Sequence, residues 1–218
     1  MNPNATLSTI LGFRPEAKIR EFLPAGIASL DAAVQGFPRG AISEIIGQDS
    51  SGRTTLIHSL LAVSTSNTEI CAYVDATDSF DPVSAAEAGV ALHQLVWIRC
   101  RKNAEHALKD TDCLIHAGGF GVVILDLCQI AGRVANRIPI SYWHRFRLAI
   151  ENTPTILVLA ETTPLAKSCA ALMIEMKRKK TMWSGAPGFQ LLRGVEIETQ
   201  PRKPAGQQPA SFIAKAIG

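Results

Sequence analysis

The chain has 218 residues, of which 47% are hydrophobic and 19% are charged, as is typical of one soluble α/β domain with short appendages. No stretch approaches about 18 apolar residues without a charge, and the chain does not open with a basic segment followed by an apolar run. We therefore expect neither a membrane span nor a secretion signal, and a cytoplasmic location. The five cysteines include no C-x-x-C pair and are interpreted as small buried residues without disulfides.

The net charge of +3 does not by itself indicate a nucleic-acid-binding protein, but two segments concentrate positive charge. The candidate DNA-contacting residues of the first segment, which also contains His144, are Arg133, Arg137, Arg145 and Arg147. Those of the second segment are Lys177, Arg178, Lys179 and Lys180. Such runs fit phosphate-contacting surfaces, although solvated turns show the same pattern. The tryptophans could stack on bases, but core or edge packing is the expected role of Trp97, Trp143 and Trp183.

In chain order, residues 1–23 are expected to form an N-terminal arm with a short helix over Pro15–Phe22. From Ala41 onward, short apolar runs alternate with helical patterns. Strands are expected at Ala41–Ile46, Ile70–Asp75, Leu95–Cys100, Val122–Leu127 and Thr155–Ala160. Helices are expected at Arg53–Val63, Pro82–Ala88, Asn103–His116 and Ile140–Ile150. Because the strands are apolar throughout, the pattern predicts a mostly parallel, doubly wound α/β sheet with helices on both faces.

The pattern changes near the end of the chain. Cys169–Arg178 and Gly188–Glu198 are two β-like runs, and the Gly and Pro residues between them predict an antiparallel hairpin at the sheet edge. Residues 201–218 hold three prolines, two glutamines and no acidic residue, so a disordered tail is expected. Its more apolar end, Ser211–Ile217, is alternatively a docking peptide.

A glycine-rich segment follows the first expected strand. Residues 47–55 match the phosphate-binding pattern G-x-x-x-x-G-K-[ST], except that Arg53 stands in the lysine position. The candidate nucleotide-binding residues here are Gly47, Gln48, Asp49, Ser50, Ser51, Gly52, Arg53, Thr54 and Thr55. Backbone N–H groups would hold phosphate oxygens, and the Thr54 hydroxyl would ligate magnesium. Because a guanidinium is larger than an ammonium and grips with two prongs, we expect nucleotide binding without efficient turnover.

Acidic residues follow several of the expected strands. Asp126 ends an apolar strand, where a carboxylate often orients magnesium, so we expect it to face Thr54. Hydrolysis also requires a base or a water-orienting group. The catalytic candidates are Asp78 and Glu161, together with Asp75. Each of these carboxylates could instead cap a helix or lie in a solvated loop.

Several segments carry a family resemblance. They are Gly26–Asp31 (GIASLD), Gly36–Gly47 (GFPRGAISEIIG), Ser50–Leu56 (SSGRTTL), Asp75–Pro82 (DATDSFDP) and Ala88–Val90 (AGV). Together they closely resemble the opening of the bacterial RecA recombinase core, and the resemblance covers residues 24–200. It implies a RecA-like P-loop core domain over this range, with ATP and Mg²⁺ as ligands. It also implies contacts with DNA and with further copies of the chain.

The chain departs from this family at catalytic positions. Thr77 stands where the family has a catalytic glutamate, and Glu161 stands where it has the glutamine that senses the γ-phosphate. Asp126 is retained, as is Asp81, which the resemblance places near the adenine. Of the family's two DNA-binding loops, the first is at most reshaped into residues 133–147, and residues 162–168 are too few for the second. We therefore expect the loss of filament strand exchange and of the family's large C-terminal domain.

A short RecA-like chain with these changes resembles the ImuA family, accessory proteins of bacterial translesion-synthesis cassettes. That family acts with a polymerase-like partner, ImuB, in damage-induced (SOS) mutagenesis. The resemblance implies a non-catalytic or weakly catalytic adaptor that binds DNA, RecA or both and recruits a translesion polymerase assembly. One alternative is an active DNA-dependent ATPase in which Arg53 with Asp78 or Glu161 takes over the missing roles. The other is a cell-division inhibitor like SulA, which shares the fold but lacks the phosphate loop.

Overall fold

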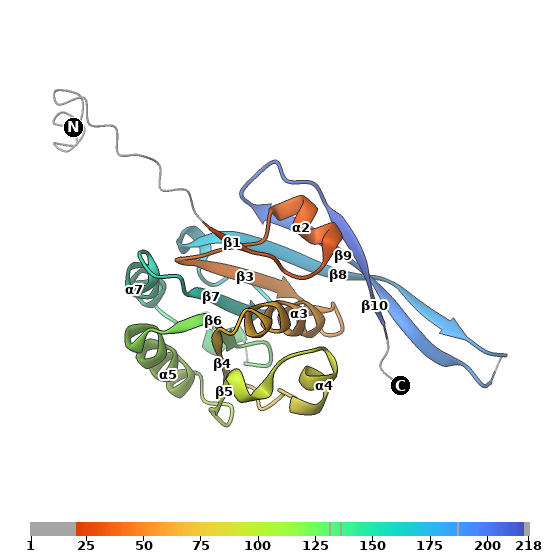
Figure 1. Cartoon of the computed structure of the whole chain (residues 1–218), viewed down its shortest axis with the longest axis horizontal. Helices are drawn as coiled ribbons and strands as arrows, with labels where there is room; N and C mark the ends of the chain where they lie inside the picture. The colour runs from red at the N-terminus through yellow and green to blue at the C-terminus, as the bar shows by residue number, and fades with distance from the viewer. Residues whose placement is uncertain (1–20, 131, 136, 187, 216–218) are drawn as a thin grey trace.

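One eight-stranded sheet organises the protein (Figure 1). The computed structural model describes residues 21–130, 132–135, 137–186 and 188–215. The strand order is β10-β9-β8-β3-β7-β6-β4-β5, in which the strands from β8 to β5 run parallel and β9 and β10 are antiparallel additions. This arrangement confirms the predicted mostly parallel α/β sheet with a C-terminal antiparallel hairpin.

The expected alternation of strands and helices is present, with small shifts at the ends of elements. The strands are β3 (Ala41–Gly47), β4 (Ile70–Asp75), β5 (Leu95–Arg99), β6 (Phe120–Asp126) and β7 (Ile156–Glu161). The helices are α3 (Arg53–Ser66), α4 (Pro82–Glu87), α5 (Ala104–Ala117) and α7 (Ile140–Ile150). The unexpected elements are β1 (Phe22–Leu23), α2 (Ala28–Val34), β2 (Phe37–Pro38), α6 (Gly132–Ala135) and 3-10 turns at Leu92–Gln94 and Lys167–Cys169. These are all short, so each offers too few residues for a clear periodic pattern.

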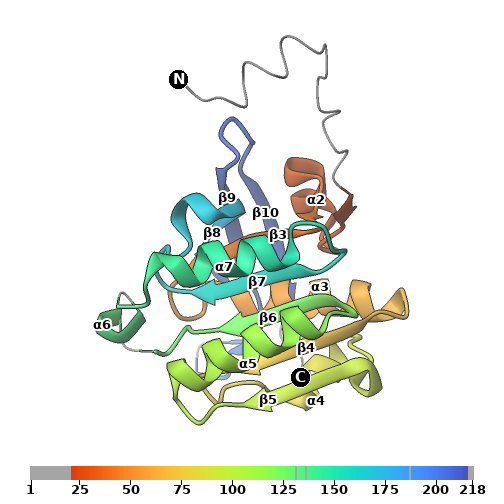
Figure 2. The same ribbon diagram turned by 90° about the vertical axis from the view of Figure 1, so that its left-hand side faces the viewer.

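Helices cover both faces of the sheet because the central strands are apolar on both sides. On one face, α2, α3 and α4 pack in an apolar cluster that contains Leu30, Leu60 and Ala85. On the other face, α5 and α7 contribute Leu108 and Phe146 to a second cluster. Figure 2 shows α5 and α7 in front of the sheet. With both faces covered, the ends of the parallel strands are the natural place for a polar site.

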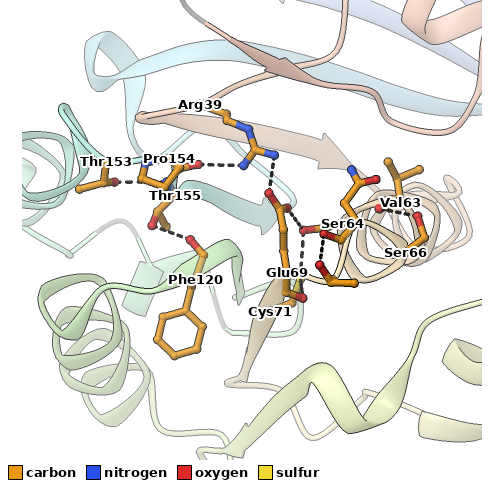
Figure 3. A network of polar contacts seen from close by, with 12 residues as sticks. Arg39, Val63, Ser64, Ser66, Glu69, Cys71, Phe120, Thr153, Pro154 and Thr155 are labelled. Atoms are coloured by element: carbon orange, nitrogen blue, oxygen red, sulfur yellow. Dashed lines mark hydrogen bonds and ion pairs between the residues drawn. The ribbon is translucent and has the colours of Figure 1, made fainter.

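A polar network fastens the amino-terminal end of the sheet, away from the glycine-rich loop (Figure 3). Arg39 forms an ion pair with Glu69 at 2.6 Å and donates to the carbonyl oxygen of Pro154 at 3.0 Å. Glu69 also accepts a hydrogen bond from the Ser64 hydroxyl at 2.5 Å. Since both charged side chains are largely buried, water screens this pair less than a surface pair. The network joins the turns that precede β3, β4 and β7.

The carboxyl-terminal part differs most from the expectation. The predicted hairpin is present as β8 (Ala170–Ser184) and β9 (Leu191–Lys203), but both strands extend beyond the predicted ranges. The expected disordered tail over residues 201–218 is wrong for its described part, because β10 (Ala210–Lys215) pairs antiparallel with β9. Pro204, Pro209 and both glutamines fall in the turn between β9 and β10. These residues account for the polar, proline-rich composition of the segment, which belongs to the turn and does not indicate the short strand that follows.

Two smaller expectations have different outcomes. The helix over Pro15–Phe22 lies outside the described residues, except for Glu21, which is not helical, and Phe22, which begins β1. The cysteines are all free, as expected, but their burial varies. Cys113 is exposed and Cys128 is half-buried, whereas the other cysteines are buried. The interpretation of all five as buried residues was therefore wrong for these two.

Candidate functional site

The glycine-rich loop joins β3 to α3 in a conformation that requires its glycines. A Cβ atom at Gly47 would lie 2.3 Å from the Ser51 hydroxyl oxygen, and one at Gly52 would lie 2.8 Å from the Ile197 side chain. Gly52 also has a φ angle of 89°, in the left-handed region that residues with a Cβ rarely adopt. The loop is therefore tightly packed, with Gly47 against Ser51 and Gly52 against β9.

The start of α3 offers hydrogen-bond donors for an anion. Its N-cap residue, Gly52, provides no side-chain acceptor for the N–H groups of the first turn. The Ser51 hydroxyl is buried and has no hydrogen-bond partner within the described chain. Free N–H groups at a helix N-terminus carry partial positive charge and bind phosphate readily. The loop thus has the donors that a phosphate group requires.

Two hollows flank this loop. The larger has a volume of about 340 Å³ and extends from Gly47, Gln48, Asp49 and Ser51 to the β8 residues Lys177 and Arg178. The smaller has a volume of about 240 Å³ and lies between Ser50–Thr55 and the β9 and β10 residues Val195, Ile197 and Ala214. The nine predicted loop residues therefore all line one or both hollows. The C-terminal strands form a wall beside the loop, which the sequence did not reveal.

Arg53 folds back under the loop. Its side chain is buried, with Nη1 3.4 Å from the carbonyl oxygen of Glu161 and Nη2 3.4 Å from a carboxylate oxygen of Asp49. Both contacts are long for an N–H···O hydrogen bond, so the guanidinium keeps donor capacity for an anion. Its charge is nevertheless held by two protein groups, unlike the mobile ammonium of a lysine.

Asp75, at the end of β4, organises the loop that follows it. Its carboxylate oxygens accept backbone N–H groups of Thr77, Ser79 and Phe80 at 3.1 Å each. They also accept the Thr77 hydroxyl and the Trp97 indole N–H. Thr77, where the resemblance implies a catalytic glutamate, thus contributes a hydroxyl bonded to Asp75. Asp75 holds the local backbone, and its lone pairs are occupied by these donors.

Asp126, at the end of β6, is also occupied by protein donors. One carboxylate oxygen accepts the Tyr73 hydroxyl at 2.8 Å and the Ser79 hydroxyl at 3.3 Å, and the other accepts the Cys128 N–H at 2.9 Å. Burial and the negative charge of Asp126 raise the pKa of Tyr73 well above its ordinary value, so the phenol remains a donor. These bonds reduce the lone pairs left for magnesium-bound water, while Thr54, in the first turn of α3, is exposed.

Glu161 lies on the face of the sheet opposite to α3. By strand alternation it shares a face with Leu157 and Leu159, which belong to the apolar cluster under α5 and α7. Its neighbour there is Glu44, and both carboxylates accept the backbone N–H of Leu165. Burial, followed by the adjacent Glu44 carboxyl group, raises the pKa of Glu161 well above its ordinary value. Its backbone carbonyl reaches Arg53, but its side chain is part of a buried carboxyl pair.

Two further acidic candidates are exposed and already paired. Asp78 forms an ion pair with Arg99 at 3.1 Å, and Arg99 also stacks on the Trp97 ring. Asp81 caps α4 by accepting the backbone N–H groups of Val83 and Ser84. Hydrogen bonds from Ser84 lower the pKa of Asp81. These contacts give both residues structural roles, and the adenine contact expected of Asp81 stays a prediction.

The first group of predicted DNA-contacting residues lies on and before α7. Arg145 pairs with Asp112 of α5 at 3.1 Å, and its guanidinium lies 4.9 Å from the ring centre of Tyr142. Arg145 therefore fastens α7 to α5. Arg137 and Arg147 are exposed. Arg133 lies in α6, and its side chain is outside the described part of the structure.

The second group lies on a different element, β8, beyond the residues that pair with β3. Lys177 pairs with Glu175 at 2.9 Å and Lys179 pairs with Glu196 at 2.8 Å. Arg178 and Lys180 form no ion pair with any described carboxylate. The two basic segments therefore lie on different elements, and ion pairs with carboxylates neutralise some of the positive charges in each segment.

Sequence reasoning missed Tyr73, Ser79 and Glu44 as members of these polar clusters. The available signals were the strand positions of Tyr73 and Glu44, because polar atoms in an apolar strand require partners. Within the described residues, no group of three or more His, Cys, Asp and Glu side chains could hold a metal ion. The structure therefore brings together a phosphate-type loop with carboxylates that protein donors already occupy.

A parallel sheet with a glycine-rich loop between a strand and a helix defines a P-loop α/β domain. Residues 8–136, more than half of this chain, match the family described as the RecA N-terminal domain, and the chain belongs to that family. Protein RecA of Bartonella quintana is 38% identical over 138 residues, which is 59% of this chain and 40% of that protein. Protein RecA of Rickettsia canadensis is 41% identical over 118 residues, which is 53% of this chain and 34% of that protein.

These matches confirm the RecA-like part of the resemblance. The chain spans 40% or less of the length of these two curated relatives. No helix in the described part of the chain is long and apolar enough to cross a membrane.

Proposed function

We propose that this chain is a RecA-family accessory protein in DNA repair that binds a nucleotide at the glycine-rich loop and hydrolyses little or none of it. The observation that carries the proposal is the occupation of both strand-end carboxylates by protein donors. Asp126 accepts the Tyr73 hydroxyl at 2.8 Å, and Asp75 accepts three backbone N–H groups. The loop keeps the donors that phosphate needs, so binding and hydrolysis are separable here.

The chemistry of hydrolysis explains why these contacts matter. A water molecule must be deprotonated or oriented beside the γ-phosphate, and magnesium must neutralise the developing charge. Thr77 supplies a hydroxyl, which is a poor base, and this hydroxyl is bonded to Asp75 and Ser79. Glu161 points to the other face of the sheet. ATP and Mg²⁺ are thus the proposed ligands, with the phosphates held by residues 47–55.

In this role the protein acts as an adaptor in the cytoplasm. It contacts DNA through its basic segments and recruits a translesion polymerase assembly, as in the ImuA family that the sequence resembles. The proposed protein partners are an ImuB-like polymerase-fold protein, RecA and further copies of the chain. Family membership supports the general role in DNA repair, and the occupied carboxylates favour an adaptor over an ATPase.

The test measures ATP binding and phosphate release with Mg²⁺, with and without single-stranded DNA. We expect binding that Gly52→Ala abolishes, because the added Cβ collides with Ile197. We expect phosphate release from the natural chain to be no faster than from Gly52→Ala. Phosphate release that DNA stimulates and Asp126→Asn removes would assign an active ATPase instead. Absence of any nucleotide binding would contradict the proposed ligand and leave a partner-binding domain.

The adaptor role has its own test. Purified ImuB-like protein and RecA are each mixed with this chain, and complex formation is measured by analytical ultracentrifugation. We expect at least one stable complex, and the nucleotide-free Gly52→Ala variant shows whether the loop controls it. A chain that remains free of both proteins would refute the proposed partners.

A further inference from the structure

The distal part of the β8–β9 hairpin exposes large apolar side chains. We define the distal hairpin as residues 177–186 and 188–193. Trp183 is 55% exposed, Phe189 86%, Leu191 63% and Leu192 40%. None of these four belongs to either apolar cluster of the described chain. Because exposure of such side chains is unfavourable in water, a cluster of them indicates a binding surface.

The hairpin projects because its strands outrun their neighbours. The pairing of β8 with β3 ends at Met176, and that of β10 with β9 ends at Gly194. Beyond these positions, β8 and β9 pair with each other alone, with Trp183 opposite Leu192. Figure 1 shows the resulting ribbon extending away from the sheet and helices. The exposed side chains are therefore accessible from several directions.

The charge of the distal hairpin is entirely positive. Its basic residues are Lys177, Arg178, Lys179, Lys180 and Arg193, and it contains no Asp or Glu. Arg178 and Lys180 have no carboxylate partner among the described residues, so their charges are available to a ligand. The complementary partner is an anion with apolar or aromatic surface between its charges.

A single-stranded nucleic acid has these properties. Its phosphates attract cations, and its unpaired bases stack on exposed aromatic rings. In a duplex the bases are stacked within the helix, where a hairpin tip cannot reach their faces. We propose that the distal hairpin binds single-stranded nucleic acid, with Trp183 and Phe189 stacking on bases and with Arg178 and Lys180 contacting phosphates. This inference deepens the proposed contact with DNA and rests on it.

Tryptophan fluorescence of the full chain tests the inference. Trp143 is buried and Trp97 is half-buried, so Trp183 is the indole most open to a base. We expect oligo(dT) to quench the emission, and the Trp183→Phe variant to lose most of that quenching. Loss of one stacked base should weaken oligo(dT) binding about 5- to 100-fold in Trp183→Ala and in Phe189→Ala. The matched control is Val83→Ala, because Val83 is 65% exposed on α4, outside both basic segments, and the change should leave the affinity unchanged.

Further arms separate the sources of binding. Oligo(rU) distinguishes RNA from DNA, and a duplex should bind more weakly and without quenching. Lys180→Gln should reduce the slope of log affinity against log salt by about 0.7, the value for one phosphate contact on a single strand. Circular dichroism confirms that each variant is folded.

Three results would overturn the inference. Oligo(dT) binding that Trp183→Ala and Phe189→Ala leave unchanged would move the DNA contact elsewhere and keep the proposed function. The hairpin would be assigned to a protein partner if sedimentation shows a dimer or an ImuB complex that the same substitutions disrupt, and oligo(dT) causes no quenching. Absence of binding to any nucleic acid at low salt would refute both the hairpin site and the proposed contact with DNA.

Discussion

Tyr73 shows how one hydroxyl group changes the chemistry available to a strand-end carboxylate. A phenylalanine in this place would pack in the same aromatic cluster, beside the Phe80 ring at 4.5 Å, without reaching Asp126. The added oxygen supplies a 2.8 Å hydrogen bond to the carboxylate. This bond gives the buried carboxylate a partner other than a metal ion, so we expect the folded state not to require magnesium at this position.

Tyr73→Phe is therefore expected to destabilise the protein and to make it respond to magnesium. Loss of a hydrogen bond to a buried carboxylate should lower the free energy of unfolding by about 1.5–3 kcal/mol. Urea unfolding measures this change, with Tyr142→Phe as the control at a half-buried site. Millimolar Mg²⁺ should raise the melting temperature of Tyr73→Phe more than that of the natural chain. Equal shifts in both proteins would show that Tyr73 does not compete with a cation for Asp126.

Glu161 makes the stability depend on pH. Its folded pKa is raised, by burial first and by Glu44 second, so the folded state favours the protonated carboxyl group. This contribution to stability is fully present below the unfolded pKa of about 4.3 and is lost as the pH rises through the folded pKa. The affected window therefore begins near pH 4.3 and extends upward.

Glu161→Gln should remove this dependence. The amide keeps an oxygen for the Leu165 N–H and adds an N–H donor for Glu44, one of whose oxygens has no partner among the described residues. We expect the variant to exceed the natural chain in unfolding free energy by about 1–2 kcal/mol at pH 8, with a smaller difference at pH 5. Denaturant melts at both pH values measure this, with exposed Glu87→Gln as the control. A difference that does not change with pH would contradict the assignment.

At the scale of elements, β9 and the glycine-rich loop are one packed unit. Gly52→Ala and Gly206→Ala form a matched pair, since the φ angle is 89° at both positions but only the first added Cβ meets another side chain. Both substitutions carry backbone strain at this φ angle, so their difference reports the contact with Ile197. We expect Gly52→Ala to cost about 1–3 kcal/mol more than Gly206→Ala in thermal unfolding. Ile197→Ala should recover part of that difference, and no recovery would show that the loop and β9 are independent.

The β10 strand gives a prediction about backbone protection. Alternate amides of this edge strand bond to β9, whereas residues 204–209 form the preceding turn. Hydrogen exchange followed by mass spectrometry should therefore show slower exchange over residues 210–215 than over the turn. Equal and rapid exchange across both segments would instead support the disordered tail that the composition predicted.

At the scale of the whole molecule, the sequence predicted what local pattern controls. Uniformly apolar strands indicated the parallel sheet, and the loop was read from its glycines and hydroxyls. The occupied carboxylates were not predictable, because they depend on register between strands distant in sequence. In the pairing of β4 with β6, Asp75 lies opposite Asp126, and this register places the Tyr73 side chain beside the Asp126 carboxylate. In the pairing of β3 with β7, Ile46 lies opposite Glu161, and this register places Glu44 near Glu161. Neither pairing can be detected from the local amino-acid composition.

The position of β3 at the centre of the sheet has a consequence for the order in which the strands can pair during synthesis. Ala41 pairs with Ile156 of β7, and Gly47 pairs with Met176 of β8, so both neighbours of β3 are translated long after it. Such distant pairings form slowly, because a long loop must close before the contacts can form. We therefore expect β3, the strand that leads into the glycine-rich loop, to lack both of its strand partners until most of the chain has been synthesised.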